Sequence, residues 1–351
     1  MSDAIHLPFD NLNPYQSMLV GGLARTGVSC AGVPWTWRLA ELIERESAGV
    51  LHFHWTHQWA QGTPLWKFPL ALAKFRHDLV VFKRRGGRVV WTVHNLHGHE
   101  RVNLWRERMI SLTLASRADV LIAHTHAAAD LIKREFPVRA DRLRVIPHGD
   151  YSDWYPNTIN KASARELLKL DQDAPVVLFF GAVRRYKGVT ELIRSFRRVD
   201  NKQAILVIAG RPRDAEYEQE IRAAARGDER VRFHLGFAHD DQVQVFLNAA
   251  DAVVFPYQDM LTSGAIVLAM SFGKASVIPD IPMMKEVAAE TAVVYDGTSQ
   301  GLTQALAHVG ARREELGLMG RAARDRAVEW SWQRIGSMVE ACYELSPRAR
   351  K

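Results

Sequence analysis

Short apolar runs alternate with helix-forming segments along the whole chain, and this alternation restricts the fold more than any other feature. The clearest run is Val176–Phe180, which ends at Gly181. An unbroken apolar run of this length is typical of a parallel strand buried on both faces. Further strands are predicted at Ala4–Pro8, Val50–Trp55, Val89–His94, Val120–His124, Leu143–Pro147, Ala204–Ala209, Val231–Leu235, Ala252–Phe255, Ala275–Ile278 and Ala292–Val294. Strands separated by helices in this way indicate an α/β protein with doubly wound sheets.

The alternation lapses between residues 149 and 162, so two domains are expected. The segment Gly149–Pro156 is rich in turn-forming and polar residues, which is typical of a linker. The chain of 351 residues is long enough for two cores. We expect Rossmann-like domains at residues 1–150 and 160–332 that face each other across a cleft.

Bulk properties point to a cytoplasmic protein with an anionic partner. The first residues lack the basic and apolar regions of a signal peptide, and no apolar run is long enough to cross a membrane. Cys30 and Cys342 lie far apart, which fits a reducing compartment. The net charge of +7 suggests a phosphorylated ligand, a membrane surface or nucleic acid as partner.

Much of the positive charge lies between Leu65 and Arg108, where apolar and aromatic residues are interspersed with lysine and arginine. A helix of this composition can lie on an anionic bilayer, which would make the protein peripheral on the inner membrane. It can equally be an ordinary amphipathic helix that packs on a sheet with its basic face in water. Strands with the basic and aromatic interleaving of single-strand binders are not seen, so nucleic acid is not an expected partner.

A cluster of cations follows the strand Val176–Phe180. Gly181 permits a tight exit from the strand, and Arg184, Arg185 and Lys187 come next. Ligands of open α/β sheets bind beyond the carboxyl ends of the strands, where these cations would suit a diphosphate. A solvated basic turn is the alternative that these residues alone leave open.

Three further segments are candidates for the same ligand site. Ser263 and Gly264 precede a helix predicted at Ala265–Phe272, whose amino end favours an anion, although plain capping is compatible with the same residues. Gly210 follows one predicted strand, and Gly236 with Phe237 follows another. These two turns could border a pocket for a base, but each alone is only a turn after a strand.

Histidines are concentrated in the first half. His52 and His54 alternate on one face of a strand, so a metal pair is conceivable, but no cysteine accompanies them and no metal site is predicted. His94 ends a predicted strand on the cleft side, where a neutral imidazole could bond a substrate hydroxyl or a reacting phosphate. Asp171 and Asp173 precede a strand instead of following one, and are interpreted as a turn.

A helix start is predicted at Asn13-Pro14-Tyr15-Gln16. Asparagine is a good cap, proline fits the first helical position, and glutamine in the third position can cap reciprocally. The helix is expected to end near Ala24. Its entry loop, with Asp10, follows the first strand and should face the cleft.

In this order and spacing, these segments resemble the retaining family 4 glycosyltransferases of GT-B fold, especially the bacterial exopolysaccharide and glycolipid branch. The resemblance covers nearly the whole chain. The segments that carry it are Asn13–Gln16, Thr92–Asn95, Val145–Gly149, Phe179–Gly188, Ala250–Tyr257, Ser263-Gly264, Phe272-Gly273 and Glu286-Val287.

The resemblance implies roles for individual residues. The second domain would bind a nucleotide-sugar donor, and the first domain, with a crossing helix at about 333–351, would bind the acceptor. Catalytic roles fall to His94, Arg184 and Lys187, and acceptor contacts to Asp10, Asn13, Tyr15 and Gln16. Donor contacts would be made by Gly181, Arg184, Lys187, Gly210, Gly236, Phe237, Asp259, Ser263, Gly264 and Glu286. No metal or other cofactor is required.

One departure from the family concerns a pair of glutamates that normally contacts the donor sugar and ribose. Met260 and Leu268 stand in their places, and neither can bond a hydroxyl. Asp259, one residue before Met260, is the candidate substitute for the first glutamate. The resemblance therefore predicts transfer from a UDP- or GDP-sugar to a lipid-linked or growing glycan, with donor identity open. A sugar-nucleotide epimerase and a non-enzymatic membrane- or polyanion-binding module are the alternatives.

Overall fold

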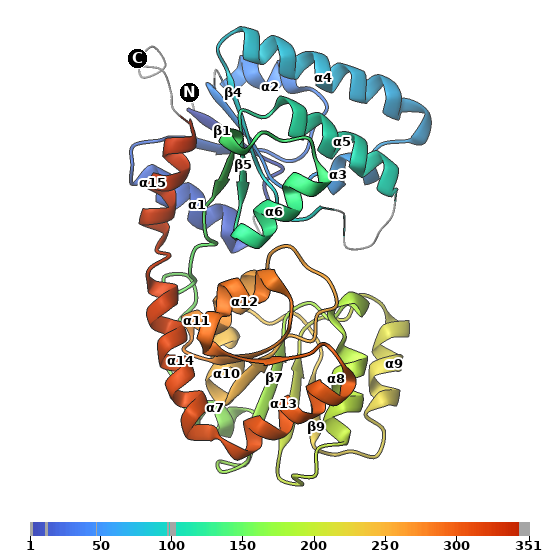
Figure 1. The fold of residues 1–351 in the computed structure, drawn as a ribbon, viewed down its shortest axis with the longest axis vertical. Helices are drawn as coiled ribbons and strands as arrows, with labels where there is room; N and C mark the ends of the chain where they lie inside the picture. The colour runs from blue at the N-terminus through green and yellow to red at the C-terminus, as the bar shows by residue number, and fades with distance from the viewer. Residues whose placement is uncertain (1–2, 11–12, 47, 97, 99–102, 344–351) are drawn as a thin grey trace. The chain divides into compact units, whose positions relative to one another are not determined.

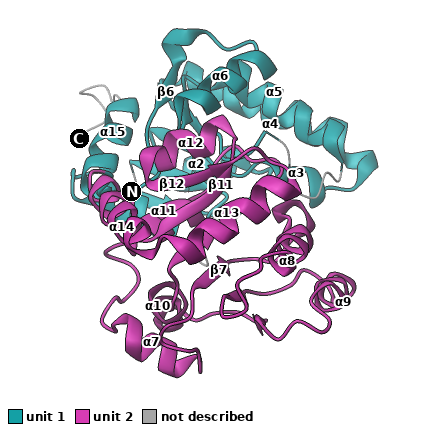
Figure 2. Ribbon diagram, turned by 60° about the horizontal axis from the view of Figure 1, so that its bottom comes forward, with its two compact units in different colours: residues 1–149, 330–351 teal, residues 150–329 magenta. Residues whose placement is uncertain are grey.

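The chain forms two compact units, which Figure 2 distinguishes by colour. Unit 1 consists of Met1–Gly149 and Trp330–Lys351, and unit 2 of Asp150–Glu329. The computed structural model describes residues 3–10, 13–46, 48–96, 98 and 103–343. His97, His99 and the predicted crossing helix beyond Tyr343 therefore lie outside the described residues.

Unit 1 is built on a six-stranded parallel sheet of order β2-β1-β3-β4-β5-β6. Its strands are β1 (Ala4–Leu7), β2 (Cys30–Gly32), β3 (Val50–Phe53), β4 (Arg88–Thr92), β5 (Val120–Ala123) and β6 (Leu143–Val145). Five of them are confirmed within a few residues. The edge strand β2 was missed, because it is three residues long, is not fully buried and contains no apolar run.

The helices of unit 1 include one from the far end of the chain (Figure 1). They are α1 (Pro14–Ala24), α2 (Leu39–Glu46), α3 (His57–Gln61), α4 (Phe68–Arg84), α5 (Leu104–Arg117), α6 (His126–Glu135) and α15 (Trp332–Tyr343). Helices α1 and α15 cross closely at two glycines. A Cβ at Gly22 would lie 2.2 Å from the carbonyl oxygen of Trp332, and one at Gly336 would lie 2.4 Å from the carbonyl carbon of Gly22.

Unit 2 is also built on a six-stranded parallel sheet, of order β12-β11-β10-β7-β8-β9. Its strands are β7 (Val176–Phe180), β8 (Ile205–Ala209), β9 (Val231–His234), β10 (Ala252–Val254), β11 (Ala275–Pro279) and β12 (Ala292–Tyr295), all close to the predicted runs. The strand order reverses between β7 and β10. In open α/β sheets, such a reversal point is where loops diverge and ligands bind.

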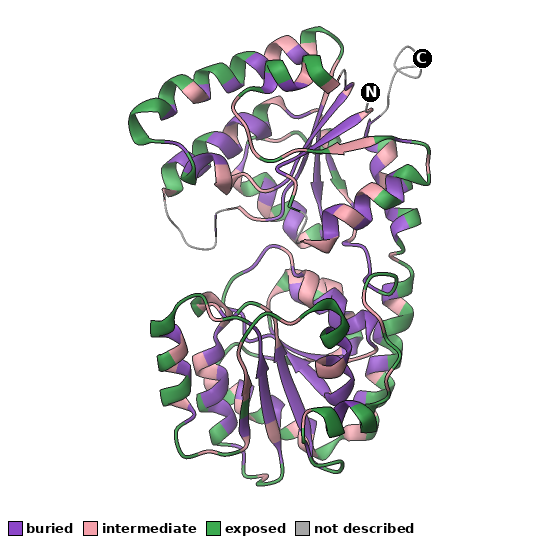
Figure 3. Ribbon diagram, turned by 180° about the vertical axis from the view of Figure 1, so that it is seen from behind, coloured by how far each residue is buried: buried purple, intermediate pink, exposed green. Residues whose placement is uncertain are grey.

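The helices of unit 2 are α7 (Lys161–Leu167), α8 (Val189–Arg197), α9 (Ala215–Ala224), α10 (Asp240–Ala249), α11 (Gly264–Ser271), α12 (Pro282–Ala288), α13 (Ser299–Ala311) and α14 (Arg313–Val328). The central strands are buried on both sides (Figure 3), which explains their unbroken apolar sequence. Asp171 accepts a hydrogen bond from the Asp173 amide at 2.7 Å and forms the expected turn before β7. No helix in the described part of the chain has the length and apolar character needed to span a membrane.

Candidate functional site

The loops that follow β7, β8 and β9 are hydrogen-bonded to one another at the carboxyl edge of the unit 2 sheet. The amide of Val183 donates to the carbonyl of Arg211 at 3.0 Å, and Arg213 donates back to Val183 at 3.2 Å. The amide of Gly236 donates to the carbonyl of Gly210 at 3.2 Å. The turns that sequence alone could treat only as separate candidates therefore form one surface.

Two glycines are required where these loops approach each other. Gly210 has a φ of +144°, and a Cβ there would lie 1.9 Å from the carbonyl oxygen of Gly181. Gly188 has a φ of +69°, and a Cβ there would lie 2.2 Å from the carbonyl oxygen of Pro256. Neither position can hold a side chain without displacing backbone, so glycine keeps the loops after β7, β8 and β10 in contact.

Lys187 is the cation best placed for an anionic ligand at this edge. It belongs to a 3₁₀ turn at Arg185–Lys187, just beyond β7, and its Nζ lies 5.3 Å from the ring centre of buried Tyr257. Burial, together with the neighbouring charge of Arg184, lowers the pKa of Lys187 to about 8. Within the described part of the chain no carboxylate forms an ion pair with this ammonium, and a diphosphate would supply a counter-charge that favours the protonated form.

Arg185 has a different environment from its neighbours. Its guanidinium forms ion pairs with Glu216, at 3.0 Å, and with Glu220, both on α9. It also lies 4.8 Å from the ring centre of Tyr217. Arg185 thus braces the loop against α9, and it is neither a free phosphate ligand nor simply solvated.

Helix α11 begins beside this loop and shows the predicted cap. The Oγ of Ser263 accepts a hydrogen bond from the Ile266 amide at 3.3 Å. The helix starts at Gly264, one residue earlier than expected. Met260 and Leu268, which replace the family's glutamates, are both buried apolar side chains. The adjacent Asp259 is exposed.

The remaining predicted donor residues lie at the border of this edge. Phe237 is 64% exposed, and its ring meets that of His239 edge to face at 5.5 Å between centroids. Glu286 lies on α12, where its backbone carbonyl accepts a hydrogen bond from Arg326 at 3.0 Å. The contacts between the loops are made mainly at the glycines, where Gly210 approaches Gly181 and Gly188 approaches Pro256.

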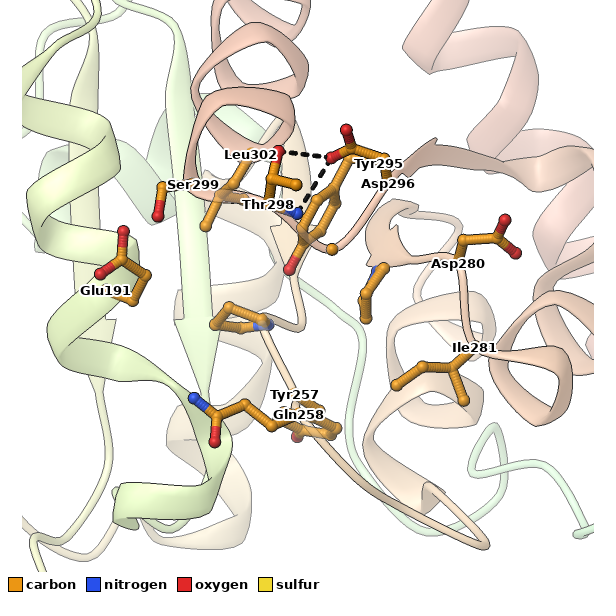
Figure 4. Close-up of a pocket in the computed structure, with 13 residues that line it drawn as sticks. Glu191, Tyr257, Gln258, Asp280, Ile281, Tyr295, Asp296, Thr298, Ser299 and Leu302 are labelled. Carbon is orange, nitrogen blue, oxygen red and sulfur yellow. Dashed lines mark hydrogen bonds between the residues drawn. The ribbon is translucent and has the colours of Figure 1, made fainter.

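A cavity of about 270 Å³ adjoins the Lys187 loop (Figure 4). It is lined by residues beyond β10, β11 and β12 and by the first turns of α8 and α13. Three carboxylates, Glu191, Asp280 and Asp296, line it together with Tyr257 and Gln258. Acidic walls disfavour a diphosphate but suit hydroxyl groups, which donate hydrogen bonds to carboxylates. The cavity could not be predicted from the sequence, because its residues come from four separate segments of the chain.

The predicted start of α1 in unit 1 is confirmed, with one correction. The Oδ1 of Asn13 accepts from the Tyr15 amide at 3.1 Å, and Pro14 opens the helix. Gln16 does not cap Asn13. Its amide nitrogen donates to the carbonyl of Pro8 at 2.8 Å, and its oxygen accepts from the Asp10 amide at 2.9 Å. The buried side chain of Gln16 therefore fixes the loop after β1.

Six buried histidines cluster in unit 1, and the rings of four of them, His54, His94, His124 and His148, contact Tyr15. Tyr15 is 3% exposed and meets the ring of His94 edge to face at 4.8 Å between centroids. Burial lowers the pKa of every one of these imidazoles, to about 3 for His6 and His148 and about 4 for His124. The full set is His6, His52, His54, His94, His124 and His148. All six are neutral at physiological pH.

Three of these histidines have the spacing of a metal site. Ring nitrogens of His6, His52 and His54 lie within 4.8 Å of one another. The same nitrogens already form hydrogen bonds, for example His6 Nδ1 to His54 Nε2 at 3.0 Å and His52 Nε2 to the Thr92 hydroxyl at 2.7 Å. His52 and His54 could be recognised from the sequence, whereas His6 of β1, and His124 and His148 beyond β5 and β6, become their neighbours only in the folded sheet.

Comparison with protein families identifies both halves of the chain. Residues 174–311 match a family described as glycosyl transferases group 1, and residues 28–149 match glycosyltransferase family 4. A GDP-mannose:glycolipid 4-beta-D-mannosyltransferase of Xanthomonas campestris pv. campestris is 26% identical over 349 residues, covering 96% of this chain and 89% of the relative. An alpha-maltose-1-phosphate synthase of Mycolicibacterium smegmatis is 27% identical, covering 72% of this chain and 69% of that protein.

Solved structures share the fold over nearly the whole chain. HepE of Anabaena, in complex with UDP and glucose, superposes with a TM-score of 0.76 at 15% identity, covering 97% of this chain and 99% of that one. Sucrose-phosphate synthase of Thermosynechococcus elongatus superposes with a TM-score of 0.75 at 16% identity and 97% coverage of both chains.

Proposed function

Because the chain belongs to glycosyltransferase family 4 and has the GT-B fold, we propose that it moves a sugar from a UDP- or GDP-sugar to a lipid-linked or growing glycan acceptor. One observation carries the proposal. Lys187 is a partly desolvated ammonium at the reversal point of the unit 2 sheet, beside the amino end of α11. A leaving diphosphate is the ligand whose charge fits this place.

GDP-mannose is the first donor to test. GDP-mannose appears in the name of the Xanthomonas mannosyltransferase described above, and the match to this chain covers 89% of that relative. In the proposed complex, Arg184, Lys187 and the Ser263-Gly264 amides hold the diphosphate without a metal ion. The acidic cavity beside Tyr257 supplies hydroxyl contacts in place of the glutamates that Met260 and Leu268 replace.

The experiment is a thermal-shift and product assay with GDP-mannose, UDP-glucose, UDP-galactose and dTDP-glucose. We expect one base to raise the melting temperature, and the same donor to label a glycolipid extract. Omission of the acceptor is the control, because an epimerase would convert the donor without it. Absence of stabilisation by every nucleotide sugar, with EDTA present or absent, would contradict the proposal.

The family resemblance predicts a front-face reaction that retains the anomeric configuration. The acceptor oxygen forms its bond to the anomeric carbon while the bond from that carbon to the diphosphate oxygen breaks. The acceptor proton passes to the departing diphosphate, whose developing charge is stabilised by Arg184 and Lys187. His94 would orient the donor sugar and the leaving phosphate.

An inverting reaction is a second candidate, and two observations favour it. The relative named above forms a beta linkage, which requires inversion if its donor sugar is alpha-linked. The pair of glutamates typical of the retaining family is also replaced by Met260 and Leu268. Inversion needs a base for the acceptor proton, and neutral His94 is a candidate. The anomeric configuration of the first-formed product, read by proton NMR, separates the two mechanisms.

Acceptor delivery is proposed to occur at a membrane surface. Helix α4 is amphipathic, since it buries Phe68, Leu72, Phe75, Leu79 and Phe82. An apolar-basic patch nevertheless stays exposed where Trp105 of α5 packs against Phe68 of α4. The patch comprises Leu65, Trp66, Leu70, Leu104, Trp105 and Met109, with Lys67, Lys74, Arg76 and Arg108. This composition suits an anionic bilayer and peripheral binding on the inner face of the membrane.

A further inference from the structure

A continuous chain of side-chain hydrogen bonds runs through the buried histidines of unit 1. It begins at the Thr92 hydroxyl, 2.7 Å from His52 Nε2. His52 Nδ1 lies 2.8 Å from the Tyr343 hydroxyl, which lies 3.1 Å from His6 Nε2. His6 Nδ1 lies 3.0 Å from His54 Nε2, and His54 Nδ1 lies 3.2 Å from His94 Nε2. We call this set the histidine chain.

The sheet itself assembles this chain. His6 of β1 is paired with His52 of β3, and His52 is in turn level with Val90 of β4. Because side chains alternate along a strand, His52 and His54 project on the same face, and so do Thr92 and His94. Tyr343 of α15, which has no exposed surface, closes the gap between His52 and His6.

Each imidazole in the chain carries one proton, because burial holds its pKa far below neutrality. A neutral ring has one N–H donor and one acceptor nitrogen. His6, His52 and His54 use both nitrogens within the chain, so each must donate at one side and accept at the other. If the Tyr343 hydroxyl donates to His6, it accepts from His52, and the opposite order reverses every link.

Proton counting therefore restricts the four rings to two collective states. With Tyr343 donating to His6, all four histidines are Nδ1–H tautomers. With Tyr343 donating to His52, all four are Nε2–H tautomers. A mixture would either leave one ring–ring link with two protons or with none, or make the Tyr343 hydroxyl accept from both His52 and His6 and leave its own proton unpaired, and each of these is costly in a buried site.

We propose that the histidine chain sets which nitrogen of His94 carries its proton and holds its ring in place, so that His6, His54 and Tyr343 are positioning residues for the sugar transfer. This inference rests on the proposed function for its catalytic meaning. Within the described residues, the Nδ1 of His94 makes no hydrogen bond, whereas its Nε2 is committed to His54. The reactive nitrogen of His94 is thus Nδ1.

The state of the chain decides what His94 offers to a substrate. In the Nδ1–H state, His94 donates a hydrogen bond to a sugar hydroxyl or a leaving phosphate oxygen. In the Nε2–H state, the Nδ1 lone pair can accept the proton of an attacking hydroxyl. The same chain would therefore serve a retaining or an inverting reaction, in opposite states.

The first test uses the wild-type protein and needs no substrate. Selective ¹⁵N-histidine labelling and long-range proton–nitrogen correlation report the tautomer of each ring, assigned by single His→Gln substitutions. We expect His6, His52, His54 and His94 to be neutral and to share one tautomer from pH 6 to pH 8. Different tautomers within the set, or a stoichiometric metal ion found by elemental analysis, would overturn the proposal.

The second test breaks the histidine chain at Tyr343, three hydrogen bonds away from His94. Tyr343→Phe removes one hydroxyl and keeps the ring, and we expect kcat to fall about tenfold or more while KM for the nucleotide sugar changes by less than about twofold. The same substitution should give His94 a mixture of tautomers. The matched control is His124→Gln, since His124 is also buried but its one hydrogen bond to a described residue is to the Ile146 carbonyl, at 2.9 Å.

Outcomes of the two tests separate this inference from the proposed function. A folded Tyr343→Phe protein with wild-type kcat would refute the positioning role while leaving transferase activity intact. If the rings share one tautomer but no nucleotide sugar stabilises the protein, the histidine chain is supported and the proposed transferase function is refuted. If Tyr343→Phe does not fold, Thr92→Val breaks the chain at its other end and is read in the same way.

Discussion

Lys187 is a single side chain whose properties are set before any ligand arrives. Its ammonium lies beside Tyr257 and near the charge of Arg184, and its pKa is lowered to about 8. The charged form is therefore less favoured in the free protein than in an ordinary lysine, and the proposed diphosphate would stabilise it. Above pH 8 the free protein loses this charge, so nucleotide affinity should decline as the pH rises through that value.

Lys187→Ala should lower kcat/KM by about 10²–10³-fold, because it removes a donor aimed at the leaving diphosphate. The fold should persist, since the substitution deletes a buried charge and leaves the glycines of the loop in place. Steady-state kinetics and circular dichroism measure the two effects. Arg185→Ala is the control, and its kcat/KM should change by less than about tenfold because Arg185 pairs with α9. Near-wild-type turnover of Lys187→Ala would defeat the assignment.

The contrast between Lys187 and Arg185 shows which properties of single residues could be predicted from the sequence. The tight turns at the glycines after β7 could be predicted from the sequence, and the proposal of a ligand site rests on the basic turn beside them. The different roles of Lys187 and Arg185 could not be predicted, because the partners of Arg185 lie on a helix that begins at Ala215. The histidine chain was hidden for the same reason, since Tyr343 meets His52 only in the folded unit.

At the scale of elements, the loops after β7 and β8 can pack together because Gly210 has no Cβ. Gly210→Ala should destabilise unit 2 by about 3 kcal/mol, because the new carbon would collide with the carbonyl oxygen of Gly181 at a φ of +144°. Urea unfolding measures the loss. Gly236→Ala should cost less than about 0.5 kcal/mol, since nothing lies within 4 Å of its added carbon. Equal costs would show that the predicted collision is relieved by loop movement.

The amino ends of α4 and α5 carry the surface proposed to meet a membrane. Trp66 and Leu70 are each 78% exposed. The double substitution Trp66→Ser, Leu70→Ser should reduce binding to phosphatidylglycerol vesicles about tenfold or more and leave the melting temperature unchanged, because the two side chains pack on little. Flotation with vesicles of phosphatidylglycerol and of phosphatidylcholine measures it. Leu318→Ser on α14, a 61% exposed position outside the patch, should have no effect. Unchanged vesicle binding by the double variant would exclude the patch.

Element positions were the part of the fold most open to prediction. Buried parallel strands give unbroken apolar runs, so β7 was located to the residue and most others nearly so. Strand β2 gives no such signal, because an edge strand of three residues needs no apolar run. The acidic cavity was equally invisible, since Glu191 and Asp296 approach each other only after α8 and α13 have packed.

For the molecule as a whole, the buried histidines make unit 1 the acid-sensitive part. Their pKa values are lowered in the folded unit, so at acidic pH the unfolded chain binds protons that the folded unit does not bind. Stability is full above the unfolded pKa of about 6.5 and is lost as the pH falls toward the folded values of about 4 for His124 and about 3 for His6. Between pH 7 and pH 5, each such histidine lowers the free energy of unfolding by about 2 kcal/mol.

Six histidines of this kind would together lower the free energy of unfolding by about 12 kcal/mol, which is comparable to the whole stability of an ordinary domain, about 5–15 kcal/mol, so unit 1 should unfold before unit 2 as the pH falls. Pulse proteolysis at pH 7 and pH 5, with the fragments mapped by mass spectrometry, should show cleavage within residues 13–149 first at the lower pH. In the described part of unit 2, His234 is the histidine whose pKa is shifted downward. Initial cleavage within residues 150–329 would contradict the assignment of acid sensitivity to the histidines.

The close crossing of α1 and α15 has a consequence for synthesis on the ribosome. Unit 2 is continuous in sequence, whereas unit 1 needs Trp332–Tyr343 to cover α1 and to place the Tyr343 hydroxyl between His52 and His6. The segment made first is thus completed last, after all of Asp150–Glu329 has been translated. A nascent chain would expose the face of α1 around Gly22 throughout that interval, and would be a natural client of a ribosome-associated chaperone.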